Sequence, residues 1–155
     1  MGLSVTRSVT FGDEHTAHAG WVAMRLEEAG ATLMAMRHTG FSPRLRVFWP
    51  EMVRDSFIDL PSADLARVSL PGPERISAMD EAFAWVGLIP PDRTLLRRLL
   101  LLRALVNPVT ERHVYSWRRL ARHLGADHRA VGRWHGDALD MVVVALRRRK
   151  FIFPP

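Results

Sequence analysis

The chain has 155 residues, of which 48% are hydrophobic, so it can bury a compact core and wholesale disorder is excluded. It contains no cysteine, which excludes disulfide bonds and thiolate metal sites. No apolar run reaches the ~18 residues of a membrane span, and residues 1–20 lack the pattern of a secretory signal. A soluble cytoplasmic protein is the expectation.

The charge is divided unequally along the chain. Residues 97–150 carry 13 basic and four acidic side chains, a net charge of +9. Residues 1–96 carry nine basic and twelve acidic side chains, a net charge of −3. A basic segment behind a mildly acidic one indicates a polyanionic partner for the C-terminal half.

The N-terminal part predicts a polar, flexible arm over residues 1–15 and a helical region over residues 16–62. Within it, a helix is expected at 16–38, because apolar residues recur there at steps of three and four, with Gly30 as a weak point. A second helix is expected at 50–60, opened by Pro50 in its first turn. Residues 63–74 contain Pro71, Gly72 and Pro73 and predict a linker.

The C-terminal part, residues 75–148, predicts a helical DNA-binding domain followed by a tail at 149–155. A helix is expected from about 73 to 86, and Pro90-Pro91 then break the chain. Asp92 is expected to cap the next helix, at 94–106, which is apolar on most of its circumference and therefore enclosed. Asn107-Pro108 end that helix and open a connector to residue 115.

The stretch SWRRLARHLGADHRAVGRWHGDAL, residues 116–139, predicts two helices joined by a tight turn at Gly125. Ser116 and Asp127 are expected to cap them, and glycine suits the left-handed turn. Small and apolar residues occupy the spacings of a helix-turn-helix: Leu120, Ala121, Leu124, Gly125, Ala126, Val131 and Trp134. The alternative is a helical hairpin used only for packing.

The outward face of the second helix is expected to carry His128, Arg129, Gly132 and Arg133, with Gly136 beyond them. Arginine on such a face can read guanine in the major groove of DNA. The glycines fit a close approach to DNA or to a partner helix, or a helix that is weak there. Four residues at the first helix are expected to contact phosphates: Ser116, Arg118, Arg119 and Arg122.

This stretch resembles the helix-turn-helix of sigma-factor region 4, which implies DNA binding and, further, contact with RNA polymerase. The wider chain resembles a family of small phage and prophage proteins of undefined function from alphaproteobacteria. The resemblance rests on WVAMRLEEAG at 21–30, WPEMVRDSF at 49–57, MDEAFAW at 79–85 and the stretch above. It implies a phage-related DNA-binding role and no catalytic residues.

Other constellations do not predict chemistry. The histidines of the basic half, at 113, 123, 128 and 135, lack the carboxylate spacing of a zinc site and are expected to face solvent or DNA. Trp21, Trp49 and Trp85 are expected in the core. No phosphate-binding loop or nucleophile elbow occurs, so neither an enzyme nor a cofactor is expected. In the tail, the aromatics of FIFPP either fold back on the core or dock on a partner.

The sequence therefore predicts an all-α protein: an N-terminal helical layer packed on a C-terminal helix-turn-helix that binds double-stranded DNA as a phage-type transcription regulator. Two alternatives stay open. One is a recognition subunit of the small-terminase type for DNA packaging, which would form a large ring. The other is an interaction module such as an antitermination factor on RNA polymerase. A homo-oligomer is compatible with each of them.

Overall fold

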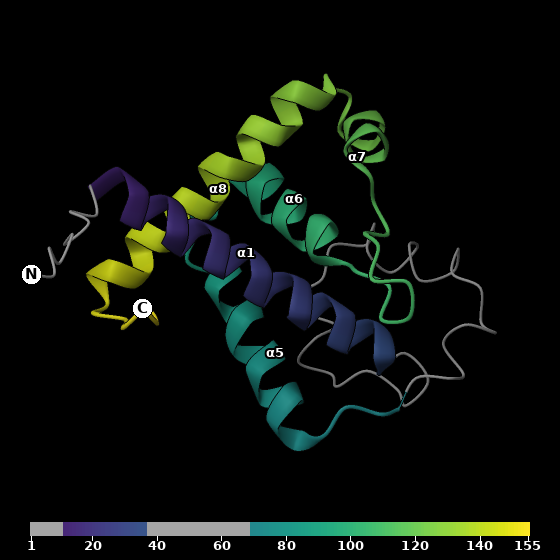
Figure 1. Ribbon diagram of the computed structural model, residues 1–155. Helices are drawn as coiled ribbons and strands as arrows, with labels where there is room; N and C mark the ends of the chain where they lie inside the picture. Colours follow the sequence, from purple (N-terminus) through teal and green to yellow (C-terminus); the bar gives the residue numbers. More distant parts are fainter. Residues whose placement is uncertain (1–10, 37–68) are drawn as a thin grey trace, which may run out of the picture.

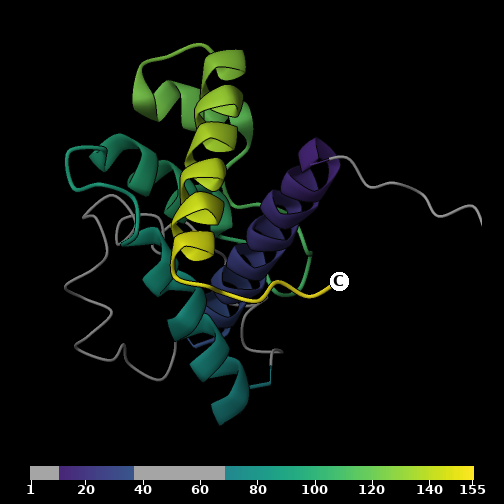
Figure 2. The same cartoon turned by 90° about the vertical axis from the view of Figure 1, so that its left-hand side faces the viewer.

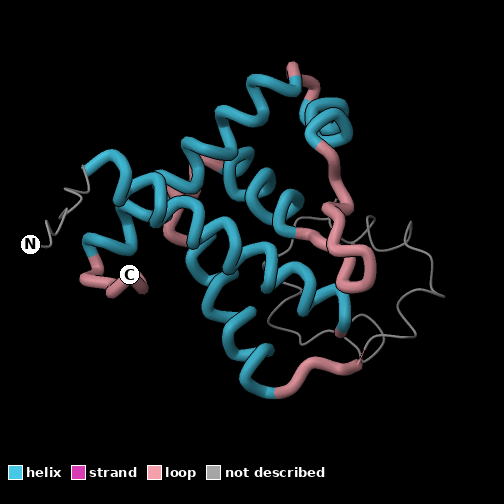
Figure 3. Tube along the Cα trace, viewed as in Figure 1, coloured by secondary structure: helices cyan, strands magenta, loops and turns pink. Residues whose placement is uncertain are grey.

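The computed structural model describes residues 11–36 and 69–155, and these segments form an all-α fold (Figure 1). Its helices are α1 (Phe11–Ala35), α5 (Pro73–Val86), α6 (Thr94–Ala104), α7 (Trp117–Leu124) and α8 (His128–Arg148). No strand occurs in the described segments, where helices alternate with loops (Figure 3). The expected helix at 50–60 and the first half of the linker at 63–74 lie outside them.

Helix α1 packs against three of the other described helices, α5, α6 and α8 (Figures 1 and 2). The predicted stripe is buried, with Val22 and Leu33 each 0% exposed. The helix begins at Phe11, five residues before the expected start, so part of the expected flexible arm is helical. Asp13 and Glu14 lie in its first turn, where carboxylates favour the positive end of the helix dipole.

Gly30 lies where α1 meets the end of α6. A Cβ atom at this position would stand 1.8 Å from the carbonyl oxygen of Ala104, so only glycine fits without movement of the backbone. The residue that weakens the helix prediction therefore has a packing role. It allows the two backbones to approach each other directly.

Helices α5 and α6 supply the other side of the core. In α5, Met79, Phe83 and Val86 are buried as expected. In α6, leucines at 96, 99, 100, 101 and 102 are buried, which agrees with its apolar circumference. The prediction that Asp92 caps α6 is wrong: the cap is Arg93, without a side-chain hydrogen bond. The turn at 90–93 places Asp92 one residue too early, and its carboxylate instead lies 3.7 Å from Arg93 Nε.

The C-terminal tail folds back onto the core. Phe151 and Phe153 pack against Trp21, and Phe151 also packs against Trp85, with ring centroids 5.6–5.7 Å apart. The tail thus adopts the first of its two expected arrangements, with Trp85 in the buried core cluster and the partly buried Trp21 packed against it. Trp49 lies outside the described residues. None of the described helices is both long and apolar enough to cross a membrane.

Candidate nucleic-acid interface

The turn between α7 and α8 is built around Gly125. Its backbone is left-handed, with φ 62° and ψ 35°, and its amide donates to the carbonyl of Ala121. The amide of Ala126 donates to the same carbonyl, at 3.0 Å. Leu120 and Val131, both 0% exposed, pack beneath the turn. The turn is therefore held from two sides, by backbone hydrogen bonds and by apolar burial.

Both helices have the caps that their sequence predicts. The hydroxyl oxygen of Ser116 accepts from the amide of Arg119 at 3.2 Å. The carboxylate of Asp127 accepts from the amide of Arg129 at 3.0 Å. Each cap satisfies a donor that the first helical turn leaves unpaired. The start of α8 is thereby fixed directly after the turn.

The candidate base-reading side chains lie on the open side of α8. His128, Arg129 and Arg133 are exposed. Neither arginine forms an ion pair with another residue in the described segments, whereas His128 Nδ1 lies 3.3 Å from the Asp127 carboxylate. A Cβ at Gly132 or Gly136 would meet no atom within 4 Å, so no helix of this chain approaches them within the described part.

The candidate phosphate contacts divide into two groups. Ser116, Arg118 and Arg122 are exposed. Arg119 is half-buried: its guanidinium lies 4.7 Å from the centre of the Tyr115 ring and donates to the carbonyl of Val114 at 3.4 Å. Three of these residues, Ser116, Arg119 and Arg122, line a hollow of about 460 Å³ together with His123. Arg119 thus forms a fixed wall of the hollow.

The positive surface at the start of α8 is interrupted by two carboxylates. Asp137 and Asp140 are exposed further along the helix, and Asp140 also lies 2.9 Å from Nε2 of His15 on α1. These carboxylates would repel a phosphate backbone. The exposed positive charge that follows the turn therefore lies within residues 128–136, and a separate basic side chain, Arg148, is exposed at the end of the helix.

A cluster that the sequence reading missed holds α7 to the rest of the molecule. The Arg103 guanidinium lies 4.1 Å from the centre of the Trp117 ring and donates to the carbonyl of Tyr115 at 2.8 Å. The ring of His135 meets Trp117 edge-on at 5.2 Å. Arg103 stands between Leu102 and Ala104 in the apolar helix α6, and its contacts with Trp117 and Tyr115 explain its position.

The expectation that the histidines of the basic half face solvent or DNA is wrong for two of them. Burial, together with the nearby charges of Arg103 and His113, lowers the pKa of His135 from its usual 6.5 to about 4. His113 is also enclosed: its Nδ1 bonds the carbonyl of Arg103 at 2.9 Å, and its Nε2 lies 3.4 Å from the Glu27 carboxylate. Burial favours the neutral imidazole ring of His135, which packs against Trp117.

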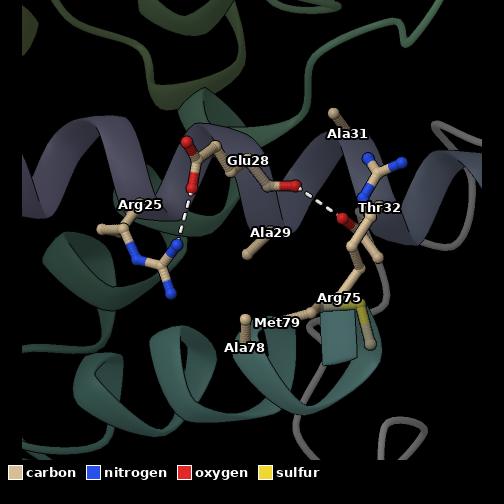
Figure 4. A pocket seen from close by; sticks show the side chains of 8 residues that line it. All are labelled: Arg25, Glu28, Ala29, Ala31, Thr32, Arg75, Ala78 and Met79. Carbon is tan, nitrogen blue, oxygen red and sulfur yellow. Dashed lines mark hydrogen bonds and ion pairs between the residues drawn. The ribbon is translucent and has the colours of Figure 1, made fainter. Parts of the chain in front are cut away.

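A second hollow, of about 380 Å³, lies between α1 and α5 (Figure 4). Arg25 lines it but is paired with Glu28 at 2.8 Å, and the Thr32 hydroxyl donates to the Glu28 carbonyl. The remaining lining is mostly alanine and methionine side chains. Across the two described segments, no three His, Asp or Glu side chains are placed to hold a metal ion.

The described residues thus define an all-α protein with a basic two-helix unit at one end. The chain belongs to the family described as a domain of unknown function, DUF6362, which matches residues 39–142. The match includes α5, α6, α7 and most of α8, and α1 lies outside it. No curated protein and no solved structure matches the chain.

Proposed function

We propose that α7 and α8 form a helix-turn-helix and that the chain is a sequence-specific double-stranded DNA-binding protein. Its role would be that of a transcription regulator of the phage or prophage type, with RNA polymerase as a further partner. The proposal rests on the αL turn at Gly125, the two capped helices and the exposed basic side chains that follow the turn.

The single observation that carries the proposal is the state of Arg129 and Arg133. Both are exposed at the start of α8 and have no ion-pair partner among the described residues. Residues 116–136 contain five arginines and one aspartate, an excess that helix packing alone does not require. Uncompensated positive charge on a convex helix end suits a phosphate-lined groove.

In such a complex, the first turns of α8 would enter the major groove. Arg129 or Arg133 could then donate two hydrogen bonds to N7 and O6 of guanine, a contact worth ~1–3 kcal/mol of discrimination. The start of α7 would lie along the backbone, where the Ser116 hydroxyl can donate to a phosphate oxygen while it accepts from Arg119. Arg118 and Arg122 would add charge without reading sequence.

The test is DNA binding by the full chain, measured as the fluorescence anisotropy of a labelled duplex at a series of salt concentrations. We expect Arg118→Ala to weaken binding to every duplex alike and to reduce the slope of log K against log salt by about 0.9, the value for one lost phosphate contact. Arg75→Ala, an equal change of charge at an exposed site of α5, should leave affinity and slope unchanged. Absence of binding to any duplex at low salt would refute the proposal.

A further inference from the structure

Helix α8 carries an exposed stripe beyond its basic end. Asp137, Met141, Val144 and Arg148 follow one another at steps of four, three and four and so share one face. Asp137 and Arg148 are exposed, Met141 is half-buried, and Val144 is 40% exposed. The buried residues of α8, among them Val131, Val142 and Val143, lie on the opposite side of the helix. The stripe therefore faces away from the core, apart from Met141, which packs at its edge beside the start of α6.

The order of side chains along the stripe makes it complementary to itself. From its first to its last residue it presents a carboxylate, two apolar side chains and a guanidinium. When a second copy runs antiparallel, Asp137 stands opposite the Arg148 of that copy and Met141 stands opposite its Val144, each pair occurring twice. Neither Asp137 nor Arg148 has an ion-pair partner within the described ranges. Apolar residues at alternating steps of three and four form the seam of paired helices.

A hollow lies beside the end of the stripe that carries Asp137. It measures about 610 Å³, lies between α8 and the start of α6, and has Asp137 and Met141 among its lining residues. Its opposite wall brings Asp92 and Leu95, the latter 40% exposed. The end of α8 in a second copy is complementary in charge to the carboxylates of this surface, because Arg148 is followed there by the exposed Arg149 and Lys150.

We propose that two copies of this chain pair through α8, antiparallel, about a two-fold axis between residues 142 and 143. The interface is the same patch on both copies, as in most closed dimers. One helix face with a few apolar side chains lies at the low end of specific interface areas. The expected assembly is therefore a concentration-dependent dimer with a dissociation constant in the micromolar range.

The pairing has a consequence for DNA that rests on the proposed function. Residue 132, at the centre of the basic segment, is ten and a half residues from the axis. At 1.5 Å per residue, the two basic segments would lie about 32 Å apart. One turn of DNA separates half-site centres by about 34–36 Å. The dimer would therefore read an inverted repeat whose half-sites are about one turn apart.

The experiment is sedimentation of the full chain without DNA over a range of concentrations. Wild type should dimerise, and Asp137→Arg or Arg148→Asp should each weaken dimerisation about tenfold or more, because each places like charges opposite one another twice. The double variant restores both pairs and should dimerise like wild type. Asp80→Arg, at an exposed site of α5, is the control and should not change the mass.

Disulfide cross-linking gives a second test, because the chain contains no cysteine and any disulfide must form between introduced residues. Oxidation of a Met141→Cys, Val144→Cys variant should yield a disulfide-linked dimer, whereas Ala84→Cys on the exposed side of α5 should not. A wild type that stays monomeric at every concentration would overturn the proposal, as would single reversals that dimerise normally. Neither assay contains DNA, so their failure is separate from a failure of DNA binding.

Discussion

At the scale of single residues, His135 makes stability depend on pH. Its pKa of about 4 in the folded chain lies below the usual 6.5, because burial and the nearby Arg103 disfavour the charged ring. The unfolded chain therefore binds the proton more readily, and stability that is present above pH 6.5 is lost as the pH falls towards 4. The difference in pKa corresponds to a loss on the order of 3 kcal/mol. Urea denaturation at a series of pH values measures it.

The matched variants for this prediction are His135→Gln and His128→Gln. Glutamine cannot take up the proton, so His135→Gln should flatten the decline of the unfolding free energy between pH 6.5 and 4. His128 is exposed, and its replacement should leave the decline in place. An unchanged decline in His135→Gln would assign the acid sensitivity to other groups.

Residues whose role is set by local hydrogen bonds were predictable from sequence, and residues whose role is set by distant contacts were not. Ser116, Gly125 and Asp127 act on amides and carbonyls within a few positions of themselves. His135 and Arg103 depend on Trp117, which the fold brings to them from another helix. Local chemistry is visible in a sequence, and a tertiary contact of this kind is not.

At the scale of elements, Gly132 separates helix stability from DNA binding. A Cβ there meets no atom, so Gly132→Ala should stabilise the folded chain by about 1 kcal/mol through helix propensity. If the backbone of α8 lies against DNA, the same methyl group should weaken affinity about tenfold, since a displaced base contact costs ~1–3 kcal/mol. Thermal unfolding and duplex titration of one preparation give both values. A stabilised variant with unchanged affinity would place α8 away from the groove.

Gly30 shows the opposite case on α1. A Cβ at this position collides with the Ala104 carbonyl, so Gly30→Ala should destabilise the chain by about 2 kcal/mol or more despite the better propensity of alanine. Gly20→Ala on the same helix meets no atom and should be neutral or stabilising. The denaturant midpoint of unfolding should therefore be lower for Gly30→Ala than for Gly20→Ala. Equal midpoints would mean that α1 does not pack closely on α6.

The elements themselves were largely predictable, because their apolar stripes are long and regular. Helix α5 spans the expected residues, since Pro73 opens it and Met79, Phe83 and Val86 form one buried face. The start of α1 was missed, because residues 12–15 carry no apolar side chain and their helix is supported by contacts such as His15 with Asp140 of α8. A polar first turn gives no periodic apolar signal.

At the scale of the whole molecule, the packing joins the first described helix, α1, to the C-terminal tail. His18 of α1 stacks on Phe153 at 4.1 Å, and its Nδ1 accepts from Arg147 at 2.9 Å. This places α1 and the tail together at one end of α8, away from the turn at Gly125 (Figure 1). The sequence left open whether the tail packs or docks, because aromatic residues near a terminus suit both.

The unequal charge was the sequence feature that bore most directly on the molecule as a whole. The α7–α8 unit extends from the core, and its exposed arginines lie outside the part of the unit that packs against the other helices. Composition could locate the positive half along the chain. It could not show that Arg119 and Arg103 are held by aromatic rings while Arg129 and Arg133 face outward.

The most direct test of DNA reading by α8 is selection of bound duplexes from a random pool, with wild type and an Arg129→Ala, Arg133→Ala variant compared side by side. We predict that wild type enriches a defined, guanine-containing motif, and that the variant still retains DNA but enriches none. Enrichment of the same motif by both proteins, or of no motif by wild type, would contradict the assignment of base reading to these two arginines.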